Sequence, residues 1–325
     1  MPDIWQKDRL YAFLRPYVDF CTRGSYRSFR VSGSLPSDKA VLIAPNHCNT
    51  LMDALVVLAT RSAGTAFGAR ADVFRKPRVA RILRWLKIVP IARARDGLRE
   101  VAQNRETMVE IDDILAHGMP FCLFPEGRHR TERTLLPLQK GIARIAFASA
   151  AERPTCIVPT GISYSDFFHF RSTCRIRFGE PIDVNLFLSR YQDYSEADRY
   201  HFLLEELSAR IQPLIDPEPA RLKAWWKWPA IILGFPFWLA SALLTLPLWL
   251  PSELLCHRLK DPAFRNTVRY GFKLLGMPLL LVLWAIPAFL LLPWWAALAA
   301  LVYFLFSYRI FYDGILLSRD SRRPC

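Results

Sequence analysis

The chain has 325 residues, and its 43 Lys and Arg against 29 Asp and Glu give a formal net charge of +14. This length holds one substantial domain and an appendage, and the charge calls for a partner of opposite sign. No recognised DNA- or RNA-binding motif accompanies the basic residues, so no nucleic-acid partner is expected. Anionic lipid headgroups or phosphorylated substrates explain the charge better.

An amphipathic helix is predicted at the amino terminus, over residues 4–23. Its apolar positions include Ile4, Leu10 and Phe13, and its basic positions include Lys7 and Arg15. Such a helix either lies on a membrane surface or packs on the domain, and we favour the membrane. Residues 1–30 are therefore expected to form a membrane-apposed segment.

Residues 31–215 interleave apolar and charged residues as a globular domain does. Strands are predicted at residues 29–31, 41–44, 121–124, 155–164 and 173–178. Helices are predicted at residues 51–61, 76–86, 98–117, 138–151 and 195–212. In the second of these, Val79, Ile82, Leu83 and Leu86 are expected to face the core. Strands alternating with helices favour an α/β fold with a mainly parallel sheet flanked by helices.

The composition changes near residue 220, and residues 216–325 are expected to anchor the chain in a membrane. Two almost uncharged runs, residues 229–252 and 276–308, are too apolar and too long for a soluble core. The first contains prolines suited to a bent element, and the second is expected to break near Pro293. Basic segments tend to stay in the cytoplasm, so we predict two hairpins; two simple crossings are the alternative.

The chemistry is indicated by two segments that each follow an apolar, strand-like run. Residues 46–53 contain His47 and Asp53, and residues 124–127 read Phe-Pro-Glu-Gly. A histidine beside a carboxylate is the minimum equipment of a general base, although His47 could also simply cap a helix. Gly-x-Ser-x-Gly, phosphate-cradling glycine and His-Glu-x-x-His motifs are absent from the sequence, and the seven scattered cysteines lack a Cys-x-x-Cys pair. Neither an acyl-serine hydrolase nor a metal site is therefore expected.

Four blocks in order resemble the glycerolipid acyltransferase superfamily. They are residues 45–53, residues 88–93 (Ile-Val-Pro-Ile-Ala-Arg), residues 124–127 and residues 157–161 (Ile-Val-Pro-Thr-Gly). Residues 135–141 also look like the family's sequence after its third block. The resemblance covers roughly residues 30–185 and implies a fold like that of glycerol-3-phosphate acyltransferases. The fourth block is expected to be an inner strand with a turn at Pro159–Gly161, and a plain core strand is the likelier role for it.

Two departures from the family pattern stand out. Five residues separate His47 from Asp53, one more than usual in the family, and Met52 occupies the usual carboxylate position. One residue turns a helical side chain by about 100°, so the extra residue must sit in the turn if the usual geometry is kept. A subgroup that includes the yeast-type glycerol-3-phosphate acyltransferases looks similar in this spacing. His129 stands where the family commonly has an arginine, between Arg128 and Arg130.

The resemblance implies roles for individual residues. His47 would deprotonate the acceptor hydroxyl, and Asp53 would stabilise the imidazolium that forms. Arg93 would hold the acceptor's phosphate, as guanidinium groups do. Glu126 either helps to shape the acceptor site or orients Arg93 or Arg130 through an ion pair. The substrate-binding residues are then expected to be Arg93, Phe124, Pro125, Glu126, Gly127, Arg128 and Arg130.

The function implied by the resemblance is membrane-bound acyl transfer in phospholipid biosynthesis. The acyl group would pass from an acyl-CoA or acyl carrier protein thioester to 1-acyl-sn-glycerol-3-phosphate or glycerol-3-phosphate, making phosphatidic or lysophosphatidic acid. No other cofactor is expected, and the catalytic domain is placed on the cytoplasmic face of the cell (inner) membrane. Acylation of a non-phosphate lysolipid is one alternative, and an inactive membrane scaffold is the other.

Overall fold

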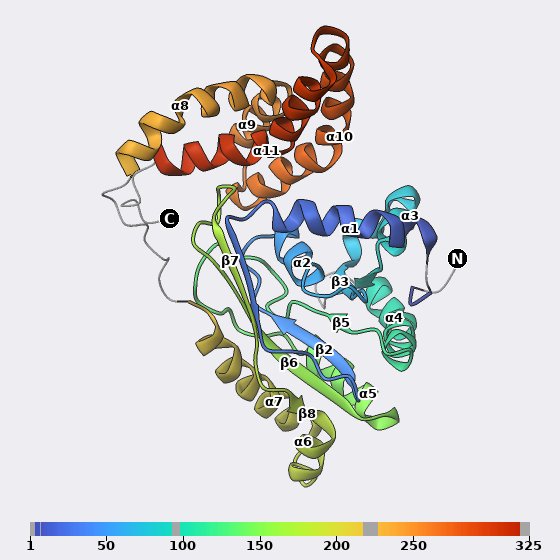
Figure 1. Ribbon diagram of the computed structural model, residues 1–325. Helices are drawn as coiled ribbons and strands as arrows, with labels where there is room; N and C mark the ends of the chain where they lie inside the picture. Colours follow the sequence, from blue (N-terminus) through green and yellow to red (C-terminus); the bar gives the residue numbers. More distant parts are fainter. Residues whose placement is uncertain (1–3, 7, 93–97, 217–226, 319–325) are drawn as a thin grey trace.

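A twisted sheet lies at the centre of the expected α/β domain, in a computed structural model that describes residues 4–6, 8–92, 98–216 and 227–318 (Figure 1). Its eight strands within these ranges are β1 (Ser28–Ser32), β2 (Ala40–Pro45), β3 (Ala66–Arg70), β4 (Ile88–Ile91), β5 (Phe121–Cys122), β6 (Thr155–Tyr164), β7 (Thr173–Phe178) and β8 (Ile182–Asp183). The order is β1-β7-β6-β2-β5-β3-β4, with β8 beside β6. Only the β6–β7 and β6–β8 pairs are antiparallel. The predicted mainly parallel α/β sheet is confirmed.

Helices cover both faces of the sheet, so its central strands β2 and β6 are buried at every position. The helices are α1 (Arg9–Arg23), α2 (Leu51–Leu58), α3 (Pro77–Trp85), α4 (Leu98–Ala116), α5 (Gly141–Glu152), α6 (Val184–Arg190) and α7 (Glu196–Ile211), with a short 3₁₀ turn η1 (Ala71–Phe74) before α3. Successive side chains of a strand point to opposite faces. Val41 and Ile43 of β2 accordingly share a core with α2. Ala40, Leu42 and Ala44 face the core formed with α4, α5 and α7.

Three sequence-based expectations were wrong in detail. The helix expected from residue 4 begins at Arg9, where the Asp8 side chain caps it. β6 runs unbroken through Pro159–Gly161, where a turn was expected. Val79, Ile82 and Leu86 are 38%, 58% and 40% exposed instead of facing the core. α3 lies at the border of the sheet, directly before the edge strand β4.

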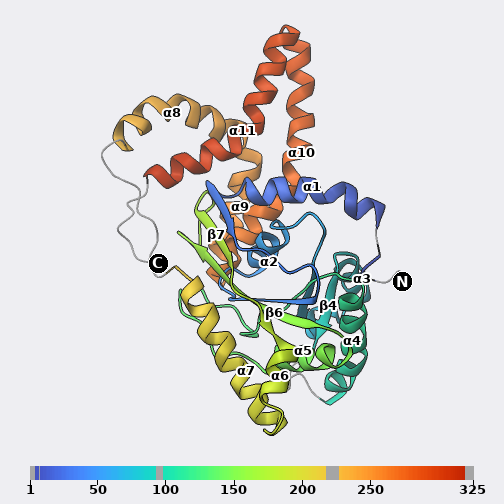
Figure 2. The same ribbon diagram turned by 60° about the horizontal axis from the view of Figure 1, so that its bottom comes forward.

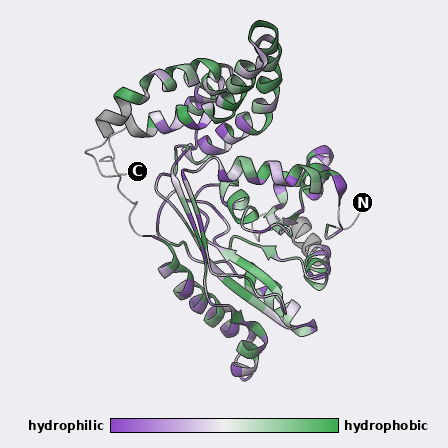
Figure 3. Ribbon diagram, in the orientation of Figure 1, coloured by the Kyte–Doolittle hydropathy of each residue, from purple (hydrophilic) through white to green (hydrophobic). Residues whose placement is uncertain are grey.

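Four apolar helices form the carboxy-terminal region: α8 (Lys227–Leu244), α9 (Leu246–Arg258), α10 (Arg265–Leu291) and α11 (Trp294–Ser318). Figure 3 shows their hydrophobic colouring. α10 and α11 are each long and apolar enough to cross a membrane, and the helices Ile232–Leu244 and Leu246–Arg258 bend by 81°. The described part of the chain thus has two candidate spans, or three if the bent pair counts as one. The predicted break near Pro293 is confirmed (Figure 2).

The carboxy-terminal helices contact the sheet domain through α1, which lies beside α10 (Figure 1), and through the loop after β6. Tyr17 of α1 donates to the carbonyl of Leu274, 2.7 Å away. Lys273 of α10 donates in turn to the carbonyl of Cys21, also at 2.7 Å. Arg171, on the loop between β6 and β7, forms an ion pair with Asp313 of α11. Side chains therefore fix the apolar helices against the catalytic domain.

Gly161 of β6 lies so close to residue 214 that a larger side chain cannot fit. A Cβ atom added at Gly161 would lie 2.4 Å from the backbone oxygen of Leu214. Gly161→Ala should therefore lower the free energy of unfolding by about 1–3 kcal/mol, measured by thermal or denaturant unfolding in detergent. Gly271→Ala is the matched control, since nothing lies within 4 Å of that position. Equal stability of the two variants would contradict this account of the fourth block.

Candidate active site

His47 and Asp53 meet at the carboxyl end of β2, where the chain turns into α2. His47 Nδ1 lies 2.8 Å from Asp53 Oδ2, and the Asp53 side chain is completely buried, whereas that of His47 is 19% exposed. A carboxylate bound to one ring nitrogen fixes the orientation and tautomer of the imidazole. Within the described residues no protein group bonds to Nε2, so this nitrogen is available to take a proton.

The longer spacing between the two residues is absorbed by the turn. α2 begins at Leu51, and Thr50 before it has a φ of +46°, a conformation that L-residues rarely adopt. The extra residue thus lies outside the regular helix. Asp53 falls in the first turn of α2 and points back to His47, while Met52 is fully buried in the core. The usual His–Asp geometry required the extra residue to lie in the turn, and the structure places it there.

The Asp53 carboxylate is surrounded by donors. The backbone N–H groups of Cys48 and Asn49 donate to Oδ2 over 2.8 and 2.6 Å. The hydroxyl of Tyr164 donates to Oδ1 over 2.9 Å from the end of β6. Burial, together with the negative charge of Asp53, raises the pKa of Tyr164 well above its usual value, so the hydroxyl keeps its proton. The hydrogen bonds compensate for the removal of a charged group from water.

Cys48 is next to the base but is unsuited to act as a nucleophile. Its side chain is buried, and its Sγ lies 3.8 Å from Asp53 Oδ1. Burial, reinforced by the negative charges of Asp53 and Glu126, raises the pKa of the thiol well above its usual value. A thiol that keeps its proton is a poor nucleophile, so Cys48 serves as a small packing residue of the core.

Glu126 fastens the first and third blocks together. Its Oε1 accepts a hydrogen bond from the backbone N–H of His47 over 2.7 Å, and its Oε2 accepts one from Leu136 N–H over 2.9 Å. Burial raises the pKa of this carboxyl. The contacts described for Glu126 are to backbone amides, and the ion pair of Arg130 is with Glu132 instead. Glu126 therefore holds the histidine turn against residues 135–141.

The third block also supplies a wall beside the His47 ring. Phe124 stacks on it with ring centroids 4.2 Å apart, and the backbone N–H of Arg130 donates to the His47 carbonyl over 3.0 Å. Pro125 is buried, and its carbonyl accepts a hydrogen bond from Gln139 N–H. Gly127 has a φ of +66°, which favours glycine in this turn. Residues 124–127 are thus held within contact distance of the base.

The three arginines that were predicted to bind substrate differ in their surroundings. Arg130 is tied locally, donating to Thr134 Oγ1 over 2.6 Å and pairing with Glu132. Arg128 is exposed at the surface. Arg93, expected to hold the phosphate, lies outside the described residues.

Asn46 is a further residue of this site that the sequence-based list omitted. Its side-chain oxygen accepts a hydrogen bond from Ile162 N–H over 2.6 Å, and its amide donates to the Ile162 carbonyl over 3.1 Å. These two bonds tie the histidine turn to β6, the strand that also positions Tyr164. An asparagine directly before the histidine was visible in the sequence, but its partner, 116 residues away, was not.

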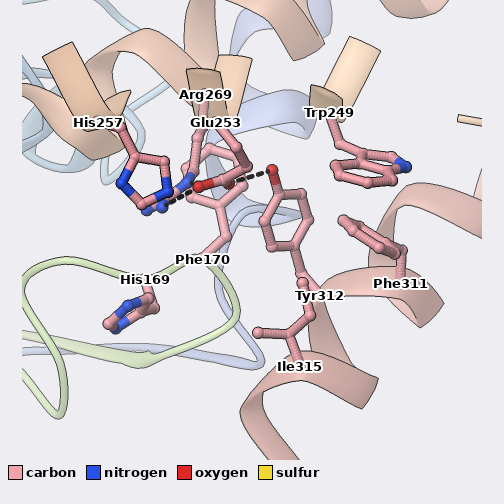
Figure 4. Close-up of a pocket in the computed structure, with 9 residues that line it drawn as sticks. All are labelled: His169, Phe170, Trp249, Glu253, His257, Arg269, Phe311, Tyr312 and Ile315. Carbon is pink, nitrogen blue, oxygen red and sulfur yellow. Dashed lines mark hydrogen bonds and ion pairs between the residues drawn. The ribbon is translucent and has the colours of Figure 1, made fainter. Parts of the chain in front are cut away.

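A hollow of about 270 Å³ lies apart from His47, between α9, α10, α11 and the loop after β6 (Figure 4). Arg269 forms an ion pair with Glu253 on one side, and Tyr312 donates to Glu253 over 3.1 Å. Arg269 also donates to the Phe168 carbonyl. These contacts join three helices to the catalytic domain, so the hollow is lined by a polar network that stabilises the junction.

A possible metal centre finds no support in the parts of the chain that the structure describes. There, no group of three or more His, Cys, Asp or Glu side chains is arranged to hold a metal ion. The chemistry available at His47 is proton transfer by a carboxylate-oriented imidazole.

The Tyr164–Asp53 hydrogen bond yields a stability prediction. Tyr164→Phe removes one donor from a buried carboxylate, and a hydrogen bond to a charged group contributes about 1.5–3 kcal/mol. The free energy of unfolding should fall by that amount, measured by denaturant titration. Tyr194→Phe, at a position 52% exposed, should change stability little. An unchanged stability of Tyr164→Phe would mean that this hydrogen bond does not support Asp53.

Residues 28–163 match the family model described as Acyltransferase. Glycerol-3-phosphate O-acyltransferases 1 and 2 of Saccharomyces cerevisiae are 32% and 35% identical to the chain over 103 and 89 residues. These matches cover 30% and 26% of the chain but only 14% and 12% of the yeast proteins. The curated relatives are therefore much longer than the matched region.

A solved structure was also found, that of the 1-acyl-sn-glycerophosphate (LPA) acyltransferase PlsC from Thermotoga maritima. The two sequences are 21% identical. The superposition covers 64% of this chain and 83% of the PlsC chain, with a TM-score of 0.41. The family model covers all of the first and third blocks, including His47, Asp53 and the residues around Glu126. Residues 28–163 therefore form an acyltransferase domain, and within the chain a segment is similar to the glycerol-3-phosphate O-acyltransferases of yeast.

Proposed function

We propose that the chain transfers a fatty acyl group from an acyl thioester to a hydroxyl of glycerol-3-phosphate or of its 1-acyl derivative. The observation that carries this proposal is the buried Asp53 bound to His47 Nδ1, which leaves Nε2 as a base at the end of β2. The similarity to the yeast glycerol-3-phosphate O-acyltransferases supports a glycerol phosphate acceptor. The net charge of +14 suits phosphorylated substrates and an anionic membrane surface.

The reaction requires one proton shuttle and no covalent enzyme intermediate. His47 Nε2 removes the acceptor's hydroxyl proton as the oxygen attacks the thioester carbonyl carbon. The tetrahedral intermediate collapses, the C–S bond breaks, and the thiolate leaves with the proton carried by His47. Asp53 stabilises the imidazolium between these steps without taking the proton itself. A thioester is already activated, so the buried thiol of Cys48 is not needed.

The membrane is the site of action in this proposal, with the catalytic domain on the cytoplasmic face of the cell membrane. Exposed apolar residues continue from α8–α11 onto α1, where Leu10, Phe13 and Phe20 are 57%, 78% and 59% exposed. α3 lies beside α1, with the Tyr11 and Trp85 rings in edge contact, and exposes Ile82. An apolar surface of this extent is typical of a membrane contact. Residues 1–30 would thus rest on the bilayer that residues 216–325 enter.

Acyl transfer by membranes carrying the full chain tests the proposal. The expected activity uses glycerol-3-phosphate, its 1-acyl derivative or both, offered separately with acyl-CoA and with acyl carrier protein thioesters. His47→Ala should lower kcat by about 10²–10⁴-fold, the usual contribution of a general base. His201→Ala, on the exposed face of α7, is the matched control and should leave kcat unchanged.

The preferred acceptor identifies the product as phosphatidic or lysophosphatidic acid. Activity only with a lysolipid that lacks phosphate would replace the acceptor class in this proposal. No activity with any acceptor, in protein shown to be folded, would favour an inactive scaffold and contradict the proposal.

Arg93 is proposed to bind the acceptor's phosphate. Arg93→Ala should raise the KM for the phosphorylated acceptor by roughly 10-fold or more, since a charge-assisted contact is lost, and leave the KM for the thioester unchanged. Steady-state kinetics against each substrate would measure the split, with Arg190→Ala as a surface control. An unchanged acceptor KM would remove Arg93 from the site.

A further inference from the structure

The connection between α9 and α10 (residues 259–264) reaches the His47 site from the membrane region. His129 Nε2 lies 2.8 Å from Asp261 Oδ2, across 132 positions of sequence. The other oxygen of Asp261 accepts a hydrogen bond from Ala263 N–H over 2.9 Å. Burial alone would raise the pKa of Asp261, but the hydrogen bonds from His129 and Ala263 hold it below its usual range. Asp261 is therefore a fixed carboxylate at neutral pH.

The His129 ring lies between this connection and the catalytic histidine. Its edge contact with His47 has ring centroids 5.8 Å apart, and its edge contact with Phe264 has centroids 5.5 Å apart. Phe264 belongs to the same connection and is 39% exposed. Edge contacts of aromatic rings depend on orientation, so the hydrogen bond with Asp261 sets how His129 meets His47.

A second contact joins the start of α10 to the turn that holds Asp53. Thr50 Oγ1 lies 3.0 Å from Thr267 Oγ1 and donates to the Ala263 carbonyl over 3.3 Å. Thr50 is the residue with the unusual φ of +46°. A strained backbone conformation persists where its surroundings hold it, and here α10 provides part of that support.

We propose that the α9–α10 connection and the first turn of α10 form a wall of the acceptor site, in which Asp261 positions His129 beside His47 and Thr267 positions the Thr50 turn. The inference rests on the proposed acyl transfer. The apolar helices then do more than anchor the enzyme. Asp261 of the connection contacts His129, just after the third block, and Thr267 of α10 contacts Thr50 of the first block. Asp261 and Thr267 are positioning residues that act through His129 and Thr50.

Kinetics of Asp261 variants of the full chain, in detergent micelles or lipid vesicles, test the first contact. Asp261→Ala should raise the acceptor KM roughly ten-fold, because the wall beside His47 loses its support, and the thioester KM should not change. Asp261→Asn should restore most of the affinity, since its amide oxygen still accepts from Nε2–H. The exposed neighbour Lys260 provides the control, Lys260→Ala, with unchanged kinetics.

A double-mutant cycle tests whether Asp261 acts through His129. The acceptor KM of the Asp261→Ala, His129→Ala double variant should be no higher than that of the more strongly affected single variant, because each change removes the same contact.

Thr267→Val should lower kcat roughly five-fold, and Thr267→Ser should restore kcat, since only the hydroxyl contacts Thr50.

Size-exclusion chromatography and thermal unfolding confirm that each variant is folded. Should Asp261→Ala not be recovered folded, Asp261→Glu carries the same expectation, because its longer side chain displaces the ring while keeping the charge. Unchanged acceptor KM in these variants, or a loss of kcat alone that Asp261→Asn does not restore, would overturn the inference. Inactive wild-type protein would instead contradict the proposed function itself.

Discussion

The burial of one carboxylate organises the whole site. Asp53 is removed from water completely, and an ionised carboxylate without partners would be costly there. Its partners come from three places: the imidazole of His47, two backbone amides of the turn and the Tyr164 hydroxyl at the end of β6. To satisfy Asp53, the chain must bring β2, α2 and β6 into one arrangement. That arrangement leaves His47 with one nitrogen bound and the other available.

The other blocks of the family hold this arrangement in place from outside. Glu126 accepts from His47 N–H and Leu136 N–H, and Asn46 pairs with Ile162. The third block thereby supports the histidine backbone, and the fourth supports the turn before it. Gly161 allows β6 to approach Leu214 closely. The first, third and fourth blocks are thus a single hydrogen-bonded unit, with the connection between α9 and α10 on one side.

Most of the longer helices and strands, and the pairing of His47 with Asp53, could be predicted from the sequence. β6 and β7 have the bounds expected from their apolar runs, and the break before α11 follows from Pro293. β3 was missed because Ala66–Arg70 lacks β-branched residues. β4 was missed because Pro90 argues against a strand in the sequence, although an edge strand tolerates it. Tyr164 and Asp261 are separated from their partners by more than 100 positions, so only the folded chain brings them to the site.

The central claim is that Asp53 holds His47 with its proton on Nδ1 and its Nε2 free. Nitrogen NMR of the full chain labelled at histidine, with the His47 signal assigned by comparison with His47→Gln, observes this directly. The account predicts the neutral Nδ1–H tautomer at high pH, lost in Asp53→Asn. A neutral His47 that carries its proton on Nε2 would contradict it, because that nitrogen could not accept the proton of the acceptor hydroxyl.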